Sequence, residues 1–270
     1  MTELSIPSVV ISAAISLDGY LDRYRPTGDH ASRLILSGAE DFDAVDALRA
    51  DCDALMVGAQ TVRADNPRLL VRSADRRDRR IASGRPASPI RVVITSSGRL
   101  DPAAAIFQTP DTPTLVYAPS SAVPGLREQL RNTTAGVVDG GDPIDLAGVA
   151  ADLGRRGGGR LLVEGGGVLN TALLRTGLVD WIRLAVAPVF VSDDRAPRWV
   201  YDDRLHSRSA LHRCLARTER VGRMTVLHYS LNSPERVAMW PSLDAQVNDS
   251  SNRQGGPDDC TDPTRRRADR

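Results

Sequence analysis

One stretch decides how this chain folds: Ala54-Leu55-Met56-Val57-Gly58-Ala59-Gln60-Thr61-Val62-Arg63-Ala64-Asp65-Asn66-Pro67. Its first four residues are uniformly apolar, which is typical of a strand buried on both faces of a parallel sheet. Gly58 then permits a turn into a short helical segment. Such a unit leaves backbone N–H groups free at the carboxyl edge of the sheet, where open α/β sheets bind ligands. By itself, however, the stretch is better explained as an ordinary strand–turn–helix unit with a glycine in the turn.

Short apolar runs alternate with amphipathic segments on both sides of this stretch. Further buried strands are predicted at residues 9–15, 90–94, 114–117, 137–138 and 160–163. Helices are predicted at residues 37–51, 122–130, 146–153 and 169–175. The first should begin at a capping box formed by Ser37 and Glu40, and the last should end at Gly177. Strands and helices that alternate in this way indicate an α/β layered fold with a mostly parallel sheet.

The rest of the chain departs from this alternation. Residues 181–191 and 224–229 are both β-like, with no long helix between them, and predict an antiparallel end to the sheet. Residues 73–89, rich in arginine, glycine and proline, predict a long surface loop. Residues 246–270 have almost no apolar side chains, and residues 232–270 as a whole are predicted to be a disordered tail, which leaves residues 1–231 as one folded domain.

Composition bounds the class of protein. The chain has 270 residues, 41% of them hydrophobic, which is enough to bury one substantial core. Its 35 basic and 34 acidic residues give a formal net charge of +1, so no overall field attracts nucleic acid or an anionic membrane. The longest apolar run, residues 184–191, is shorter than the roughly 20 residues that span a bilayer. Glu3 stands where a signal peptide needs positive charge, so a cytoplasmic protein is predicted.

Lysine is absent from the sequence, so all 35 basic residues are arginine. This excludes enzymes that need a lysine amine, such as Schiff-base and pyridoxal enzymes, and it excludes a lysine-bearing P-loop. The cysteines at positions 52, 214 and 260 are odd in number and widely spaced, which fits neither a disulfide framework nor a zinc site. The four histidines also lack metal-ligand spacing. No metal site is predicted.

Polar or glycine-rich loops follow four of the predicted strands. Glu164 ends one strand and precedes three glycines and a helix, an arrangement that lets a ligand approach closely and offers N–H donors to an anion. Thr95 and Ser96, with Arg99 nearby, follow another strand and suit a cofactor 2′-phosphate. Residues 16–19 follow the first strand. Each loop alone is consistent with a surface turn, but the coincidence of four favours one shared crevice.

Together, these segments resemble the reductase domain of the bifunctional riboflavin-biosynthesis deaminase/reductase family, whose relatives include archaeal pyrimidine reductases and, more distantly, dihydrofolate reductases. The resemblance covers residues 8–230 and is carried by residues 16–19, 56–62, 65–67, 91–94, 164–166, 178–180 and 187–188. It implies a dihydrofolate-reductase-like three-layer fold with helices on both faces of the sheet, a homodimer, and NADPH as cofactor. The implied reaction opens a phosphoribosylamino sugar and reduces its C1′, with 5-amino-6-(5-phosphoribosylamino)uracil or a close aminopyrimidine as substrate.

The resemblance also implies roles for individual residues. Two are implied to be catalytic, Asp65 beside the reacting ribose and Glu164 at the aminopyrimidine edge. The residues implied to bind the cofactor are Val57, Gly58, Thr61, Val62, Thr95, Ser96, Gly165, Gly166, Gly167 and Val168. Those implied to bind the substrate are Ser12, Asp18, Ser37, Arg49, Asn66, Arg68 and Arg72. Among these, Arg49 and Arg72 suit the substrate phosphate, because a forked guanidinium pairs with it in bidentate fashion.

Two features depart from the family pattern. Bacterial members commonly carry lysine six residues before the aspartate of the S-L-D-G element, where this chain has Ser12, and residues 28–37 form a longer polar loop than usual. The zinc elements of the deaminase half are absent, so deamination is not expected. Two alternatives therefore stay open: a paralogous reductase of another pteridine-like or secondary-metabolite substrate, and a non-catalytic cofactor-binding protein with the same fold.

Overall fold

The computed structural model describes residues 6–26, 29, 32–201 and 214–231. The predicted tail at residues 232–270, and the histidines His30, His206 and His212, lie outside these residues. The strands are β1 (Ser8–Ile15), β2 (Ala54–Gly58), β3 (Ile90–Ile94), β4 (Thr114–Ala118), β5 (Ala135–Asp139), β6 (Arg160–Val163), β7 (Val179–Val186), β8 (Cys214–Val221) and β9 (Met224–Ser230). The helices are α1 (Ala39–Asp51), α2 (Ala59–Asp65), α3 (Ala74–Ala82), η1 (Ala105–Phe107), η2 (Ser120–Ala122), α4 (Val123–Gln129), α5 (Leu146–Arg155) and α6 (Gly167–Thr176).

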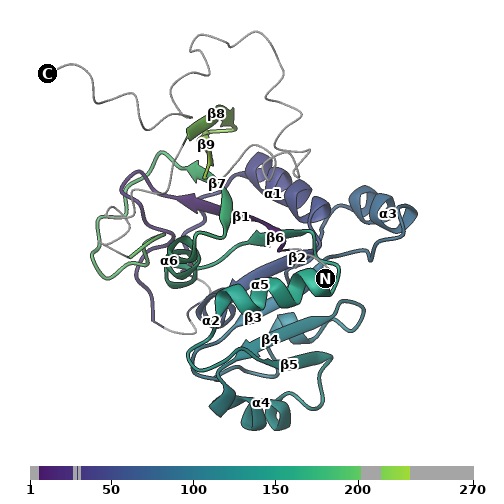
Figure 1. Cartoon of the computed structure of the whole chain (residues 1–270). Coiled ribbons are helices and arrows are strands. Elements are labelled where there is room, and N and C mark those ends of the chain that lie inside the picture. The colour runs from purple at the N-terminus through teal and green to yellow at the C-terminus, as the bar shows by residue number, and fades with distance from the viewer. Residues whose placement is uncertain (1–5, 27–28, 30–31, 202–213, 232–270) are drawn as a thin grey trace, which may run out of the picture.

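All nine described strands join in one sheet, in the order β5-β4-β3-β2-β6-β1-β7-β9-β8 (Figure 1). Pairing is parallel from β5 through β7 and antiparallel where β7 meets β9 and β9 meets β8. The mostly parallel sheet and its antiparallel end are therefore confirmed. β8 was not predicted, because its charged residues 217, 219 and 220 hide the apolar pattern of a strand at the sheet edge.

Helices cover both faces of the sheet, as the fold class requires. On one face, Val10 and Leu55 from the strands pack against Leu48 of α1, Val62 of α2 and Leu126 of α4. On the other face, alternate residues of the same strands pack against the following side chains of α5 and α6: Val149, Leu153, Leu169 and Leu173. This alternation along each strand explains why its sequence is apolar throughout. The three-layer α/β fold is confirmed.

Three local predictions are wrong. α1 begins at Ala39 with Gly38 as its N-cap and without a side-chain cap, so Ser37 and Glu40 form no capping box. The strand predicted at 181–191 ends at Val186, shortly before Pro188, which cannot donate to a ladder.

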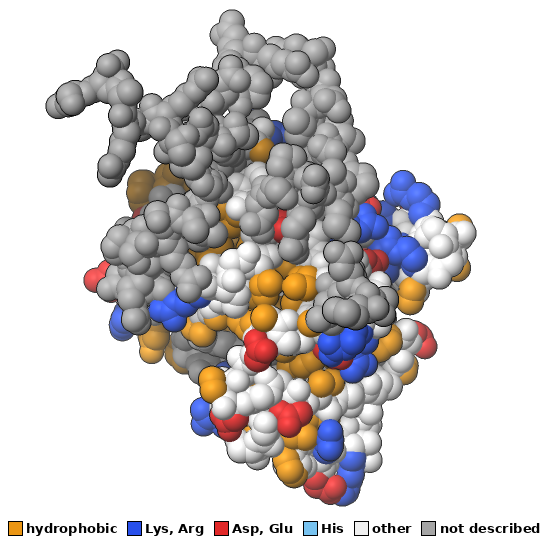
Figure 2. Space-filling view, viewed as in Figure 1, with side chains coloured by type: hydrophobic (Ala, Val, Ile, Leu, Met, Phe, Trp, Pro, Cys, Tyr) orange, Lys and Arg blue, Asp and Glu red, His pale blue; other side chains and the backbone are white. Residues whose placement is uncertain are grey.

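The third error concerns the predicted loop at residues 73–89, which contains α3 (Figure 2 shows basic side chains gathered over it). Ser73 caps this helix, and its only large hydrophobic residue, Ile81, is exposed. The helix instead buries Arg80, whose guanidinium donates to the carbonyl oxygens of Ala50 and Cys52 at 2.7 and 2.8 Å. A helix docked by arginine–carbonyl bonds carries no apolar stripe for a sequence pattern to find.

A buried ion pair fixes α1 on the sheet. Nη2 of Arg183, on β7, lies 2.5 Å from Oδ1 of Asp41 in the first turn of α1, and the side chains are only 3% and 1% exposed. The second oxygen of Asp41, Oδ2, has no hydrogen-bond partner among the described residues. Arg183 is paired in register with Ser12 on β1 and with His228 on β9, so a polar row crosses the sheet beneath α1. No helix in the described part of the chain is long and apolar enough to cross a lipid bilayer.

We expect Arg183→Met to lower the free energy of unfolding by about 3–5 kcal/mol, because it leaves the Asp41 carboxylate buried without a counter-charge. Replacing both partners, as Arg183→Met with Asp41→Leu, should recover most of this loss, since two apolar side chains leave no buried charge. Urea denaturation of the two variants provides the measurement. A loss below about 1 kcal/mol in the single variant, the level of an exposed ion pair, would show that the pair does not hold α1.

Candidate active site

The carboxyl ends of the parallel strands lie along one edge of the sheet, and β6 marks the point where the strand order reverses. From β2 the chain builds outward through β3, β4 and β5, then returns to insert β6 between β2 and β1. Val163 at the end of β6 is paired with Met56 on β2 and with Ile11 on β1. Ligands of open α/β sheets bind at such a reversal. The crevice is therefore expected beside Glu164, the residue after β6.

Two helices begin next to one another at this edge. α2 starts after Gly58 and α6 starts after Gly166; both glycines are extended, and neither helix has a side-chain cap. A Cβ added at Gly166 would lie 3.3 Å from Oγ1 of Thr61 in α2, which shows how closely the two helix starts approach. Their uncapped N–H groups and positive dipole ends suit the phosphates of a dinucleotide.

The neighbouring glycines serve packing as well. A Cβ at Gly167 would lie 2.0 Å from the carbonyl oxygen of Arg198 and 2.6 Å from the Tyr201 ring, so only glycine lets residues 198–201 cover the first turn of α6. A Cβ at Gly165 would lie 3.0 Å from Oδ1 of Asn170, a buried oxygen without a hydrogen-bond partner in the described structure. An unpaired buried acceptor beside a glycine loop suits a ligand that donates a hydrogen bond. The edge thus fits a dinucleotide.

The other residues implied for the cofactor divide by exposure. Val57 and Val62 are buried in the core, so their side chains position the α2 turn. Thr95 is also buried and its Oγ1 accepts from the Gly98 N–H at 3.1 Å, while Ser96 is exposed. Val168, in the first turn of α6, is 64% exposed and offers apolar surface at the crevice.

Glu164 is held by an arginine from α1. Its Oε1 and Oε2 lie 2.6 Å from Nε and Nη2 of Arg49, in a bidentate, mostly buried pair. Arg49 also donates from Nη1 to the carbonyl oxygen of Leu70 at 3.2 Å. Burial opposes the charge of Arg49, but the attraction of Glu164 outweighs it and raises the pKa of Arg49. The sequence placed these residues on different parts of the substrate, whereas the structure joins them, so Arg49 is not free for a phosphate.

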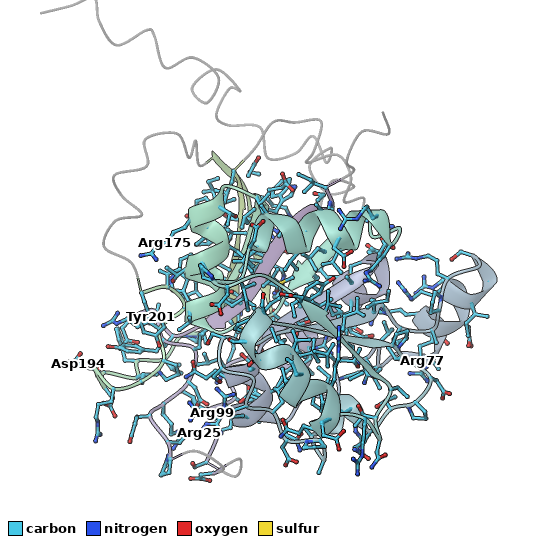
Figure 3. All side chains as sticks on the ribbon, turned by 60° about the horizontal axis from the view of Figure 1, so that its bottom comes forward. Arg25, Arg77, Arg99, Arg175, Asp194 and Tyr201 are labelled. Atoms are coloured by element: carbon cyan, nitrogen blue, oxygen red, sulfur yellow. The ribbon has the colours of Figure 1, made fainter. Side chains whose placement is uncertain are left out.

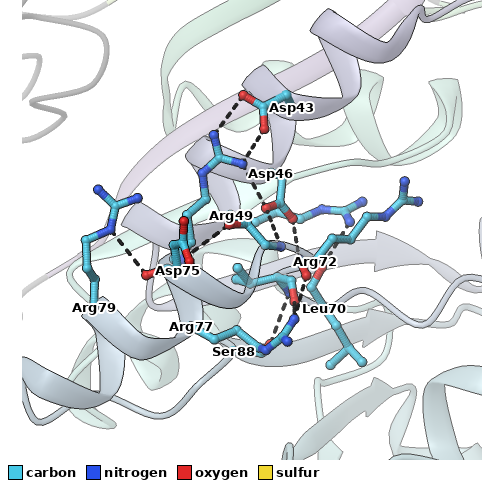
Figure 4. A network of polar contacts seen from close by, with 12 residues as sticks. Asp43, Asp46, Arg49, Leu70, Arg72, Asp75, Arg77, Arg79 and Ser88 are labelled. Carbon is cyan, nitrogen blue, oxygen red and sulfur yellow. Dashed lines mark hydrogen bonds and ion pairs between the residues drawn. The ribbon is translucent and has the colours of Figure 1, made fainter.

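Arg72 and Arg68 remain available for a phosphate. Both are exposed, and neither has an acidic partner among the described residues. The Arg72 guanidinium lies over the Phe42 ring, 5.4 Å from its centroid, which orients it by a cation–π contact. Figure 4 shows the guanidinium groups of Arg49 and Arg72 extending in the same direction. Asp46 of α1 fixes this segment by accepting from the Arg72 and Ser73 N–H groups at 2.5 and 3.1 Å.

Asp65 is the last residue of α2 and is held by two arginines that the sequence did not single out. Its Oδ1 lies 2.5 Å from Nη2 of Arg25, and its Oδ2 lies 3.4 Å from Nη2 of Arg33. Arg25 lies in the loop after β1, where no periodicity or spacing marks it. The next residue, Asn66, caps α2 in the left-handed conformation and accepts from the Ala105 N–H at 2.7 Å, so the structure gives it a structural contact.

The remaining residues implied for the substrate lie around the end of β1. Asp18 accepts from the Ser192 N–H at 2.8 Å, from the Val191 N–H at 3.1 Å, and from the Ser16 hydroxyl at 2.6 Å. Ser12 is buried one position beyond the Ile11–Val163 pair, level with Glu164. Ser37 is half-buried before α1. In the described part of the chain, no group of three or more His, Cys, Asp or Glu residues could hold a metal ion.

Known proteins with similar sequences point to one family. The profile of the RibD C-terminal domain matches residues 7–227. A 2,5-diamino-6-ribosylamino-4(3H)-pyrimidinone 5′-phosphate reductase of Archaeoglobus fulgidus is 36% identical over 217 residues, which cover 80% of this chain and 94% of that protein. The protein of the same name from Methanothermobacter thermautotrophicus is 38% identical over 185 residues, 68% of this chain and 79% of that one.

Solved structures agree on the fold. The crystal structure of a pyrimidine reductase-like protein from Corynebacterium diphtheriae superposes with a TM-score of 0.70 at 20% identity, covering 85% of this chain and 94% of that chain.

Asp18 makes stability depend on pH. Although desolvation opposes its ionisation, hydrogen bonds from Ser16, Ser192 and Val191 lower the pKa of Asp18 to about 2, below the ~3.9 of an unfolded aspartate. The contribution of ionised Asp18 to the free energy of unfolding is therefore complete above about pH 4 and is lost as the pH falls toward 2. We expect Asp18→Asn to lower the melting temperature at pH 7, and we expect the gap from the wild type to close between about pH 4 and pH 2.

Thermal unfolding followed by circular dichroism across this pH range provides the measurement. Asp111→Asn, at an exposed aspartate, is the matched control and should show no such convergence. A gap for Asp18→Asn that stays constant down to pH 2 would contradict the assigned role.

Proposed function

The chain belongs to the RibD C-terminal domain family, and from this premise we propose that it is an oxidoreductase of riboflavin biosynthesis that reduces the ribosyl carbon C1′ of a phosphoribosylaminopyrimidine. The observation that carries the proposal is the placement of Glu164 directly after β6, beside two uncapped helix starts, with Asp65 at the other end of one of these helices, α2. Hydride transfer needs two reactants held in fixed geometry rather than a nucleophile, and two uncapped helix starts beside an anchored glutamate support such an arrangement.

The substrate we propose is 2,5-diamino-6-ribosylamino-4(3H)-pyrimidinone 5′-phosphate, after which the relatives at 36% and 38% identity are named. Glu164 supports this choice because a carboxylate only accepts hydrogen bonds and has about four acceptor positions. Arg49 occupies one position on each oxygen. A pyrimidinone with a 2-amino group carries this group next to a ring N–H, and the two can donate side by side to the remaining acceptor positions of Glu164. The deaminated uracil expected from the sequence has an oxygen in place of the amino group, so it offers one donor fewer.

The cofactor we propose is NADPH, which supplies the hydride. The N–H groups after Gly58 and Gly166, with Thr61 between them, would hold its phosphates. Arg99 and Ser96 follow β3 and are exposed, so a guanidinium and a hydroxyl are available to a 2′-phosphate. Arg63 of α2 donates to the Arg99 carbonyl at 2.9 Å and so joins the loop after β3 to the helix whose start would hold the phosphates. The valine surface at position 168 would exclude water beside the nicotinamide.

The substrate phosphate is assigned to Arg72 and Arg68, because Arg49 is committed to Glu164. A homodimer, a cytoplasmic location and a folded domain at residues 1–231 complete the proposal. Sedimentation equilibrium of the purified protein tests the dimer.

We expect the diamino compound to be reduced with a kcat/KM about 10- to 100-fold above that of 5-amino-6-(5-phosphoribosylamino)uracil, the effect of one hydrogen bond to a charged group. The assay follows NADPH oxidation at 340 nm, with dihydrofolate as the control substrate. In Glu164→Gln this preference should collapse, while Glu128→Gln, which breaks an exposed arginine–glutamate pair, should leave it intact. Equal turnover of both pyrimidines by the wild type would show that Glu164 does not recognise the 2-amino group. Turnover of neither compound, despite NADPH binding, would favour a paralogous reductase with another substrate.

We also expect Gly166→Val to raise the Kd for NADPH about tenfold or more, since the branched side chain crowds the helix starts where phosphates bind. The backbone at this position is extended, a conformation that valine also adopts. A loss of NADPH affinity would therefore show that the phosphates can no longer approach the helix starts. Quenching of intrinsic fluorescence by NADPH provides the measurement. Gly125→Val is the matched control, because nothing lies within 4 Å of a Cβ added there. An unchanged Kd in Gly166→Val would place the cofactor elsewhere.

A further inference from the structure

The carboxylate of Asp65 occupies a position that disfavours it. Asp65 is the last residue of α2, where the helix dipole is negative and a negative side chain is destabilising. The described structure offsets this with Arg25, whose Nη1 donates to the Ala64 carbonyl oxygen at 2.8 Å and whose Nη2 meets Asp65 Oδ1 at 2.5 Å. One guanidinium thus binds both the end of the helix and the carboxylate. An unfavourable local placement that neighbouring groups compensate, as here, is typical of a functional position.

Arg25 is itself fixed from the other side. Its Nε lies 2.7 Å from Oδ2 of Asp22, and Nη1 also donates to the carbonyl oxygen of Asp29 at 2.8 Å. Asp22 is anchored in turn, because its Oδ1 accepts from the Arg23 and Leu34 N–H groups at 2.8 and 2.7 Å. All three guanidinium nitrogens of Arg25 therefore have a hydrogen-bond partner. Burial opposes its charge, but Asp22 and Asp65 outweigh this and raise the pKa of Arg25, so it stays a cation.

The two oxygens of Asp65 have unlike partners. Arg25, on Oδ1, is 8% exposed, whereas Arg33, on Oδ2, is 50% exposed and stands 3.4 Å away. A buried, multiply bonded guanidinium keeps its geometry, while an exposed ion pair at that distance is screened by water and contributes little. Figure 3 shows Arg25 on the side of the molecule that also carries Arg99 and Tyr201, far from Arg77 on α3. Arg25 thus lies on the same side as the proposed cofactor loop.

We propose that Arg25 is a positioning residue that holds Asp65 through Oδ1 and presents Oδ2 to the substrate, with Arg33 as the partner that the substrate displaces. The inference rests on the proposed function, because it assigns a direction to a carboxylate proposed to act there. Arg25 adds no chemistry of its own. Its effect is orientational: the plane of the carboxylate is set by the Arg25–Oδ1 bond, so Oδ2 points in one direction before substrate arrives.

The two arginines provide a matched pair of variants. In Arg25→Met, kcat with the diamino substrate should fall about 10- to 100-fold, as misplacement of a reacting group by a fraction of an ångström to 1 Å does. The Kd for NADPH should stay within about twofold, because Arg25 contacts none of the cofactor residues. In Arg33→Met, kcat should change less than about threefold, since an exposed ion pair is screened by water and is weak. Arg25→Lys retains the charge without the fork and should recover only part of kcat.

Two further measurements separate orientation from general stability. Methylguanidinium added to Arg25→Ala should restore part of kcat, and it should have no effect on Arg33→Ala. Crystal structures of the two methionine variants should show Asp65 in altered or multiple rotamers only in the Arg25 variant. A kcat loss that is larger in Arg33→Met, or an unchanged Asp65 rotamer in Arg25→Met, would overturn the inference. If the wild type reduces neither pyrimidine, the proposed function fails, and the Asp65 rotamers still decide whether Arg25 sets its orientation.

Discussion

The insertion of β6 between β2 and β1 is the constraint on which the site depends. The backbone N–H of Glu164 donates to the carbonyl oxygen of Met56 at 2.9 Å, so the residue after β6 is bound to the strand that leads into α2. This bond brings the glycines after Glu164 against the glycine turn after β2, which is why two helices begin side by side. It also sets Glu164 level with Ser12 on β1. Candidate site residues from Ser12 to Val168 converge because β6 pairs with β2 on one side and with β1 on the other.

Several elements of this structure are docked by arginine side chains rather than by lysine or by apolar packing. Arg91, at the start of β3, is fully buried and donates to the carbonyl oxygens of Thr109 and Thr112, and burial lowers its pKa to about 10. Arg80 docks α3 in the same manner, and Arg183 docks α1 through a carboxylate. A planar fork with five donors satisfies several carbonyls at once, which a lysine ammonium cannot do in fixed geometry. α1, α3 and the segment before β4 are therefore held by guanidinium groups, which carry no hydrophobic signature.

This explains what the sequence could and could not predict. Strands, the glycine turns at residues 58 and 166, and their shared edge follow from local apolar runs and from the rule that parallel strands end on one side. The pairs Arg49–Glu164 and Arg25–Asp65 join residues 115 and 40 positions apart, and no local period marks such a pair. α3 was missed for the same reason: its docking uses Arg80, so its sequence resembles a solvated loop. The capping box failed because the N-cap of α1 lies one residue later than predicted, so that Gly38, which has no side chain to accept a hydrogen bond, stands there in place of Ser37.

Three carboxylates were expected at the site from the sequence, and in the structure they have different partners. Asp18 accepts from two backbone N–H groups and a hydroxyl, and these bonds fix the turn after β1. Glu164 is clamped on both oxygens by one buried guanidinium, so it is a fixed anion suited to recognition through its remaining lone pairs. Asp65 alone is divided between a buried arginine and an exposed one. A carboxylate with one permanent and one exchangeable partner can admit a substrate without losing its orientation, and this difference in partners is the basis for the separate roles that we propose for Asp65 and Glu164.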